Sequence, residues 1–221
     1  MARLSTGTDG LDEFLEGGFL EGSVNLVTGG PGSGKTTMCS QYIRAGLEND
    51  EKCLYITTGQ RPSDVRQDAK SFGIELDITD DNLSMAHVSP SENVAEDIKE
   101  RIADSSFERI VLDSISVFEM NWGQKEQIRK YVNRLMEHFR DISATVLVTS
   151  ERPESESGKL SRFGVAEFIV DGVILLNGYA LGETTYRSAR VIKMRRTNIS
   201  GEILNVELNG DGLSISPAER L

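Results

Sequence analysis

The chain has 221 residues, of which 38% are hydrophobic and 27% charged, and these proportions are typical of a soluble globular protein with one large domain. No apolar run approaches the ~20 residues that a membrane helix needs, and the N-terminus lacks the apolar core of a signal peptide, so we expect a cytoplasmic protein without membrane contact. The formal net charge of −11 argues against nucleic acid as a partner, because proteins that bind nucleic acid usually present a basic face.

Apolar runs alternate with helical stretches over the first two thirds of the chain. The runs predict buried strands, and the stretches between them carry apolar residues three and four positions apart, as amphipathic helices do. Strands are expected at 23–29, 52–58, 83–88, 109–114 and 144–150, and helices at 34–48, 62–72, 92–104 and 124–140. Strands that are separated by helices favour a parallel sheet covered on both faces.

The last third of the chain has a different pattern. Its apolar runs are joined by short connections that contain Gly or Asn, at 171–178, 186–195, 202–208 and 212–216. Such connections are typical of antiparallel strands, so we expect an antiparallel extension of the sheet. The most exposed stretch is expected at 152–161. No linker or repeat divides the sequence, and residues 1–221 are therefore predicted to form a single α/β domain.

One segment matches a phosphate-binding pattern. GGPGSGKT, from Gly29 to Thr36, fits G-x-x-x-x-G-K-[ST], and it lies between a predicted strand and a predicted helix. Glycines let the backbone wrap around phosphates, and the helix N-terminus adds positive potential. Lys35 is expected to reach the β- and γ-phosphates, and the Thr36 hydroxyl to coordinate Mg²⁺. The predicted nucleotide-binding residues of this segment are Gly29, Gly30, Pro31, Gly32, Ser33, Gly34, Lys35, Thr36 and Thr37.

Two further strand ends carry polar residues. RIVLDS places Asp113 at the end of a buried strand, and ligands of open α/β sheets bind beyond such ends. Asp113 is therefore a candidate for holding Mg²⁺ through water, or else a cap of the following turn. The next predicted strand, at 144–150, also ends in polar residues, namely Thr149, Ser150 and Glu151.

At this point the sequence resembles a known family, the KaiC domains in the RecA branch of P-loop ATPases. The resemblance covers about residues 3–215 and rests on several blocks that occur in the family's order. These blocks are LSTGTDGLDEFLEGGFLEGSVNLVTGGPGSGKT, SFGIELD, RIVLDSIS, VTSERPESESGKLSRFGVAEFIVDGVILL and VIKMRRTNISGE. Circadian-clock members carry two such domains in tandem, and this sequence has one, so we do not expect clock function to carry over. The scarcity of lysine, with 8 Lys against 16 Arg, would suit a salt-loving archaeal source.

The resemblance implies a RecA-like fold and a ring, usually a hexamer, with ATP between subunits. Lys193, Met194 and Arg195 lie where the family has residues that reach the γ-phosphate of a neighbouring subunit. Residues two apart in a strand face the same side, so Lys193 and Arg195 are expected to project together. The alternative is a solvated edge strand whose charges discourage aggregation. Thr197 and Ser71 match family positions that touch the sugar or the base. The resemblance also implies that a polar residue among Thr149, Ser150 and Glu151 senses the γ-phosphate, and the alternative is that these residues cap the strand end.

The chain departs from the family at the tip of the second predicted strand. The family typically has two adjacent glutamates there, and the matching residues are Gly59 and Gln60. A glutamine cannot take a proton, although it can orient water. General-base assistance commonly contributes roughly 10²–10⁴-fold, so hydrolysis is expected to be slower than in a relative with the glutamate. Glu151 could substitute as the base.

Three functions are compatible with the sequence. The first is a slow MgATP-hydrolysing switch with Lys35, Gln60, Lys193 and Arg195 as its catalytic residues, which could act through protein signalling partners. The second is a non-hydrolysing scaffold that ATP orders. The third is a recombinase paralogue that acts on DNA. The candidate DNA-facing loops at 117–125 and 151–163 hold no basic excess, which counts against the third function.

Overall fold

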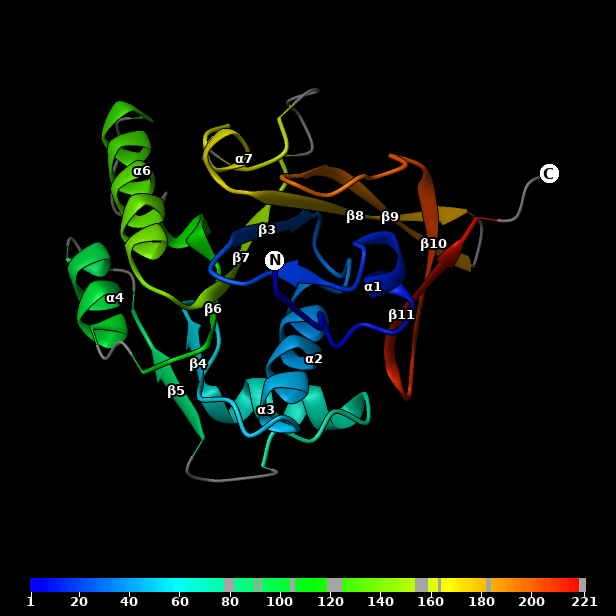
Figure 1. The fold of residues 1–221 in the computed structure, drawn as a ribbon, viewed down its shortest axis with the longest axis horizontal. Coiled ribbons are helices and arrows are strands. Elements are labelled where there is room, and N and C mark those ends of the chain that lie inside the picture. Colours follow the sequence, from blue (N-terminus) through cyan, green and yellow to red (C-terminus); the bar gives the residue numbers. More distant parts are fainter. Residues whose placement is uncertain are drawn as a thin grey trace.

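A nine-stranded sheet forms the centre of the molecule (Figure 1). The computed structural model describes residues 1–77, 82–89, 91, 93–103, 106–118, 125–153, 159–162, 164–181 and 184–218. The strand order is β11-β10-β9-β8-β3-β7-β6-β4-β5, with Val24–Gly29 (β3), Cys53–Thr57 (β4), Leu83–His87 (β5), Arg109–Asp113 (β6), Thr145–Glu151 (β7), Gly172–Leu181 (β8), Thr184–Met194 (β9), Ile203–Asn209 (β10) and Gly212–Pro217 (β11). The strands from β8 to β5 run parallel, and β9 to β11 are antiparallel. The predicted parallel sheet with an antiparallel C-terminal extension is confirmed.

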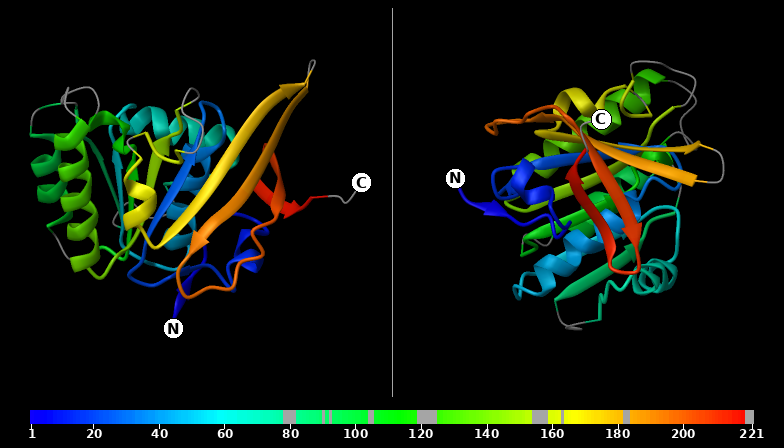
Figure 2. Two further views of the ribbon diagram at one scale, coloured as in Figure 1. Left: turned by 90° about the horizontal axis from the view of Figure 1, so that it is seen from above. Right: turned by 90° about the vertical axis from the view of Figure 1, so that its right-hand side faces the viewer.

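The prediction for the strand at 171–178 is wrong in one respect. This strand, β8, pairs in parallel with β3, from Asn25 opposite Gly172 to Gly29 opposite Leu176, and it is antiparallel only to β9. The connection from β7 to β8 contains the short helix α7 (Ala166–Ile169) and is long enough for the crossover that a parallel pair needs. β8 and β9 form a long hairpin that extends beyond the parallel strands (Figure 2).

Helices cover both faces of the parallel strands. α2 (Lys35–Leu47) and α3 (Pro62–Ser71) pack on one face, and α4 (Val94–Ile102) and α6 (Lys125–Asp141) pack on the other. Alternate residues of each strand serve the two cores: in β3, Val27 packs with α2, and Leu26 packs with α6. The β-branched residues of these strands fit such a sheet, which is buried on both sides.

Shorter elements complete the described chain. They are β1 (Arg3–Leu4), α1 (Leu11–Phe14), β2 (Phe19–Leu20) and the 3₁₀ helix η1 (Ile115–Val117). β1 and β2 pair antiparallel with each other, outside the large sheet. Within the part of the chain that the structure describes, no helix has the length and apolar character of a membrane span.

The carboxyl ends of β3, β4, β6 and β7 meet at one edge of the sheet, where ligands of parallel α/β sheets bind. The loop after β3 leads directly into α2, and α3 starts shortly after β4 with Pro62 in its first turn. Proline suits this position because its missing N–H has no partner at the start of a helix. This edge therefore carries the predicted phosphate loop, Asp113, Gln60 and the end of β7.

Candidate functional site

The phosphate loop has the backbone that its glycines predict. β3 ends at Gly29 and α2 begins at Lys35, and between them Gly32 and Gly34 adopt φ values of +69° and +100°. Side chains rarely tolerate this left-handed region. A Cβ on Gly29 would lie 2.3 Å from the carbonyl oxygen of Leu176 in β8, so this position also requires glycine. The loop is therefore held between β8 and the first turn of α2.

The outer side of the loop is open. A Cβ added at Gly30 or Gly32 would meet no described atom within 4 Å, and Pro31 is exposed. Ser33 is 1% exposed, and its Oγ has no hydrogen-bond partner among the described residues. Thr37 is buried in α2, one residue beyond Thr36. An open loop with a buried, unpaired hydroxyl fits the binding of an anion that brings its own acceptor oxygens.

The Lys35 amine lies across this loop. Its Nζ donates hydrogen bonds to the carbonyl oxygens of Gly29 (3.0 Å) and Gly30 (2.8 Å). Burial lowers the pKa of Lys35, and the nearby carboxylates of Asp113 and Glu151 oppose this shift. The hydrogen bonds recorded for this amine go to two neutral carbonyls, so it would gain from a phosphate anion at the same place.

Asp113 brings the neighbouring strand ends together. Its Oδ2 accepts hydrogen bonds from the Thr36 hydroxyl (2.8 Å) and the Tyr55 hydroxyl (3.0 Å), and its Oδ1 accepts one from the Thr149 hydroxyl (2.5 Å). The described residues contain no group of three His, Cys, Asp or Glu side chains that could cage a metal. Mg²⁺ suits the pair of Thr36 and Asp113, because it commonly uses one or two protein oxygens and completes its shell with water and phosphates.

Gln60 lies just beyond the tip of β4, as the sequence predicts. Its backbone N donates to Thr57 Oγ1 (3.1 Å), and Thr57 Oγ1 donates to its carbonyl oxygen (2.9 Å). The Gln60 side chain donates from Nε2 to Asp68 Oδ2 in α3 (2.8 Å). Ser71, at the end of α3, is exposed, and its hydroxyl bonds to the Asp68 carbonyl oxygen (2.7 Å). Gly59 adds no side chain at this tip.

The three polar residues that end β7 differ in what they contact. Thr149 reaches Asp113, as described above. The Ser150 Oγ accepts a hydrogen bond from the backbone N of Arg162 (3.1 Å), and Glu151 forms an ion pair with the Arg162 guanidinium (3.0 Å). Glu151 also lies close enough to Lys35 to influence its pKa. Of the three predicted γ-phosphate sensors, Thr149 and Glu151 therefore face the phosphate loop.

Lys193 and Arg195 lie together at the end of β9. Lys193 Nζ donates to the carbonyl oxygen of Val170 (2.6 Å), and Arg195 Nη1 donates to Asp171 Oδ1 (3.0 Å). Burial and the charge of Arg195 lower the pKa of Lys193, which shows that the two cations are neighbours. Met194, between them, is buried on the other face of the sheet with α2.

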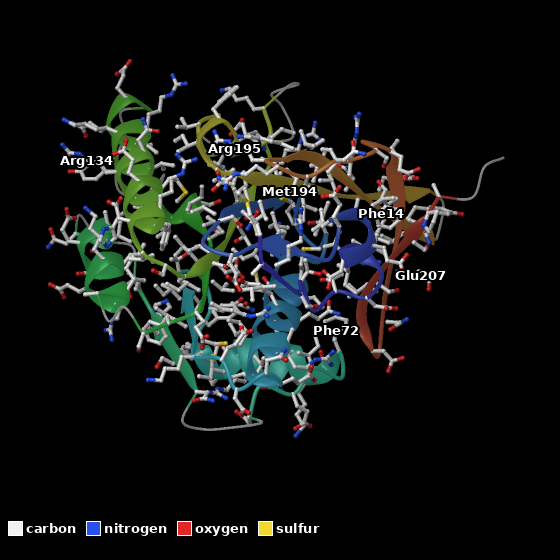
Figure 3. All side chains as sticks on the ribbon, viewed as in Figure 1. Phe14, Phe72, Arg134, Met194, Arg195 and Glu207 are labelled. Carbon is white, nitrogen blue, oxygen red and sulfur yellow. The ribbon has the colours of Figure 1, made fainter. Side chains whose placement is uncertain are left out.

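This pair of cations is remote from the phosphate loop of its own chain. Asp171, which binds Arg195, also accepts a hydrogen bond from the backbone N of Val24 (3.1 Å), the first residue of β3. The phosphate loop starts at Gly29, at the other end of the same strand, about 17 Å away at ~3.3 Å per residue. Figure 3 likewise shows Arg195 far across the molecule from Phe72, which follows α3.

Thr197 lies beside the two cations rather than near the loop. Its hydroxyl donates to the Arg195 carbonyl oxygen (3.3 Å) and accepts a hydrogen bond from Arg3 Nη2 (3.0 Å). The predicted site residues therefore form two clusters. The first surrounds the phosphate loop, and the second lies at the amino ends of the parallel strands.

Comparison with known proteins identifies the family. A family model described as "ATPase: KaiC" matches residues 4–220. The chain belongs to the KaiC ATPase family. Its relatives include the circadian clock oscillator protein KaiC of Parasynechococcus marenigrum, 29% identical over 97% of this chain, and that of Prochlorococcus marinus strain SARG, 31% identical over 90%. The chain spans less than half the length of these two relatives, 45% and 43%.

A solved structure resembles this KaiC-family chain over its whole length. The crystal structure of a KaiC-like protein from the hyperthermophilic archaeon Pyrococcus horikoshii matches with a TM-score of 0.86 and 31% identity, and it covers 98% of this chain and 99% of the other. The RecA-like fold is therefore shown by sequence and by structure.

Sequence reasoning missed three side chains of the candidate site. Tyr55 and Asp68 are the partners of Asp113 and Gln60. The third is Arg187 of β9, whose Nε lies 3.5 Å from the Gly32 carbonyl oxygen. Alternation along β9 could have indicated Arg187, because residues two apart face the same side of the sheet and Ala189 is buried on that side. Helical periodicity gave no reason to single out Asp68.

Proposed function

We propose that this KaiC-family chain binds MgATP between the subunits of a hexameric ring and hydrolyses it slowly, as a regulatory or signalling switch. The observation that carries the proposal is the contact between the Thr36 hydroxyl and Asp113 at the mouth of the open phosphate loop. This contact supports the expected roles of the two oxygens on the Mg²⁺ side of the nucleotide, because Thr36 directly follows Lys35 and these are the groups that phosphoryl transfer from a nucleoside triphosphate uses.

In the proposed reaction, water attacks the γ-phosphorus as the bond to the β-phosphate oxygen breaks. The loop amides and Lys35 hold the β- and γ-phosphates, and the Thr36 hydroxyl with Asp113 orients the metal side of the nucleotide. Bound Mg²⁺ would neutralise charge that develops on the phosphate oxygens. The hydrogen bonds from Tyr55 and Thr149 fix the Asp113 carboxylate in this position.

The position of Lys193 and Arg195 supports action on a neighbouring subunit. They are too far from their own phosphate loop to contact its nucleotide, whereas a ring would bring them to the loop of the next subunit. Lys193 also lines an apolar pocket of about 400 Å³ together with Phe168, which is 74% exposed. Phe168 is an exposed aromatic residue beside the cations Lys193 and Arg195, and aromatic and cationic side chains of this kind are typical of surfaces that a second subunit covers.

Slow turnover follows from Gln60. An amide at the tip of β4 orients water without accepting its proton, so the assistance of an acid at this position is absent.

A non-hydrolysing, ATP-ordered scaffold is the second candidate function. The hydrogen bond from Gln60 to Asp68 favours it, because that bond takes up one of the two N–H groups with which the Gln60 amide could hold water. Action on DNA is the third candidate, and the net charge of −11 argues against it.

Phosphate release and mass measurement test the first proposal together. The wild type should release phosphate from MgATP slowly, and Lys35→Ala should reduce release to background. The mass in solution should rise to that of a ring when MgATP is added, and Lys193→Ala/Arg195→Ala should lower the rate in the assembled protein. ATP binding without release above the Lys35→Ala background would select the scaffold. A monomer in saturating MgATP would refute the intersubunit roles.

A further inference from the structure

A carboxylate from α3 lies next to the strand tip that has none of its own. Asp68 Oδ2 accepts a hydrogen bond of 2.8 Å from Gln60 Nε2. Asp68 lies eight positions after Gln60 in the sequence, in the second half of α3, and the hydrogen bond brings the two side chains together. The acid that the tip lacks is thus present one hydrogen bond away.

Both side chains line a pocket beside the phosphate loop. This pocket has a volume of about 140 Å³, enough for a few water molecules. Its walls are Thr36, Thr37 and Ser40 from α2 and Gln60, Asp68, Ala69 and Phe72 from the β4 tip and α3. Thr36 is the residue whose hydroxyl contacts Asp113. The pocket that Gln60 and Asp68 line is therefore also lined by Thr36, the residue that contacts Asp113.

The local packing keeps the pair in place. Two hydrogen bonds between Thr57 and the backbone of Gln60 fix the tip of β4. On α3, Val65 and Ala69 are buried against the core, and Asp68 is adjacent to this stripe, three residues after Val65. Asp68 is itself exposed, so a proton that it accepts has a path to solvent.

The other carboxylates near the loop are engaged. Asp113 accepts hydrogen bonds from three hydroxyls, and Glu151 is ion-paired with Arg162 at 3.0 Å. Among the described residues, the contact recorded for the Asp68 carboxylate is the one from Gln60. Asp68 therefore has free acceptor capacity, which a general base needs.

We propose that Asp68 is the proton acceptor for the attacking water and that Gln60 orients this water. The proposal rests on the ATPase function proposed above. As the bond between the water oxygen and the γ-phosphorus forms, the bond to the β-phosphate oxygen breaks and its electron pair leaves with ADP. The proton of the water passes to the Asp68 carboxylate and then to solvent. Asp68 thus supplies part of the assistance that a strand-tip acid would give, and turnover stays slow but measurable.

Asp68→Asn is the first test. The asparagine keeps the shape of the side chain and an oxygen that accepts from Gln60, and it removes the ability to take a proton. The kcat for phosphate release should fall roughly 10²-fold, at the low end of general-base contributions, while the KM for ATP changes less than about threefold. Asp64→Asn is the matched control. Asp64 lies in the first turn of the same helix against the Ser63 hydroxyl, and its variant should hydrolyse ATP like the wild type.

The double variant Gln60→Glu/Asp68→Asn exchanges the amide and the acid between the two positions. It should restore kcat to the wild-type value or above it. Wild-type turnover in Asp68→Asn would overturn the proposal, as would a double variant as slow as Asp68→Asn. These results leave the ATPase proposal intact if the wild type exceeds Lys35→Ala. If the wild type does not exceed Lys35→Ala, the ATPase proposal fails and the role of Asp68 fails with it. Urea unfolding of each variant checks that the fold is unchanged.

Discussion

Glu51→Gln should destabilise the protein strongly, because Glu51 neutralises a buried arginine. Arg109, the first residue of β6, is 1% exposed, and its guanidinium forms a two-pronged ion pair with Glu51. Its Nη1 also donates to the carbonyl oxygens of Ser5 (2.6 Å) and Tyr42 (3.1 Å), and its Cζ lies 4.7 Å from the centre of the Tyr42 ring. The charge is therefore fully inside the protein, and Glu51 is its counterion.

The size of the effect follows from burial. Removing one partner of a buried ion pair typically costs about 3–5 kcal/mol, because the remaining charge is left without compensation. The Glu51 side chain is 14% exposed, and two carbonyls and a ring still contact Arg109 in the variant, so we expect the low end, about 3 kcal/mol. For a chain of this length, 3 kcal/mol corresponds to a fall in Tm of roughly 6–12 °C.

Urea unfolding followed by circular dichroism measures this loss. Glu48→Gln is the matched control, since Glu48 pairs with Arg44 in α2 at 3.4 Å, and its side chain is 53% exposed. A pair of this kind contributes about 0.3–0.5 kcal/mol. The reasoning would be refuted if Glu51→Gln lost no more stability than Glu48→Gln. In that case the carbonyls and the Tyr42 ring would be sufficient to hold the Arg109 charge.

Two further outcomes test the vicinity of the phosphate loop and the core. Arg187→Ala should weaken ATP binding about fivefold, which corresponds to ~1 kcal/mol for an exposed charge-assisted contact. Arg190→Ala, on the opposite face of the sheet, is the control and should leave the Kd for ATP unchanged. Calorimetric titration measures both Kd values, and equal Kd values for the two variants would show that Arg187 has no role. Burial raises the pKa of the Cys53 thiol to about 12 and also raises the pKa of Cys39. At pH 8 iodoacetamide should therefore leave both thiols unmodified in the folded protein and label both in urea, and labelling of the native protein in an intact-mass measurement would contradict this.

The parallel part of the sheet could be predicted because its information is local. Each strand is a short, continuous apolar run, and each helix between two strands has its own apolar stripe. The pairing of β8 depends instead on the path of the chain from Glu151 to Gly172, which crosses over the sheet. Sequence periodicity does not reveal that path, so the pattern of the last third predicts β8 as part of the antiparallel extension. β1, β2, α1 and α7 are two to four residues long, too short for any periodicity to reveal them. Residues 119–124 and 154–158 of the expected loops at 117–125 and 152–161 lie outside the described residues. The described residues of 152–161 are half-buried or buried, so the expected exposure of that stretch is not found in them.

The candidate site likewise contains residues that the sequence predicts and residues that only the structure reveals. The phosphate loop is contiguous in sequence, and Asp113 follows a recognisable strand, so spacing alone indicated both. The sequence also predicts that Lys193 and Arg195 project to the same side of their strand, because side chains alternate along it. The distance between these two residues and the phosphate loop could not be predicted, because it depends on the order of strands in the sheet. Asp68 could not be found from sequence because an exposed acid in a helix is ordinary; only its contact with Gln60 distinguishes it.

That contact also bears on why an amide occupies the strand tip. A glutamate at position 60 would face Asp68 at hydrogen-bond distance, and two carboxylates so close repel unless they share a proton. A pair of acids at the tip and at position 68 therefore takes up a proton more readily than a single acid does, and the pair that holds a proton has one free base fewer. Gln60→Glu alone should hydrolyse ATP faster than the wild type at pH 8 and lose this advantage as the pH falls and the pair takes up a proton. Gln60→Glu/Asp68→Asn, which has a single acid, should keep its rate to lower pH. If the pH–rate profiles of the two variants coincided, the two side chains would not be in contact in the working enzyme.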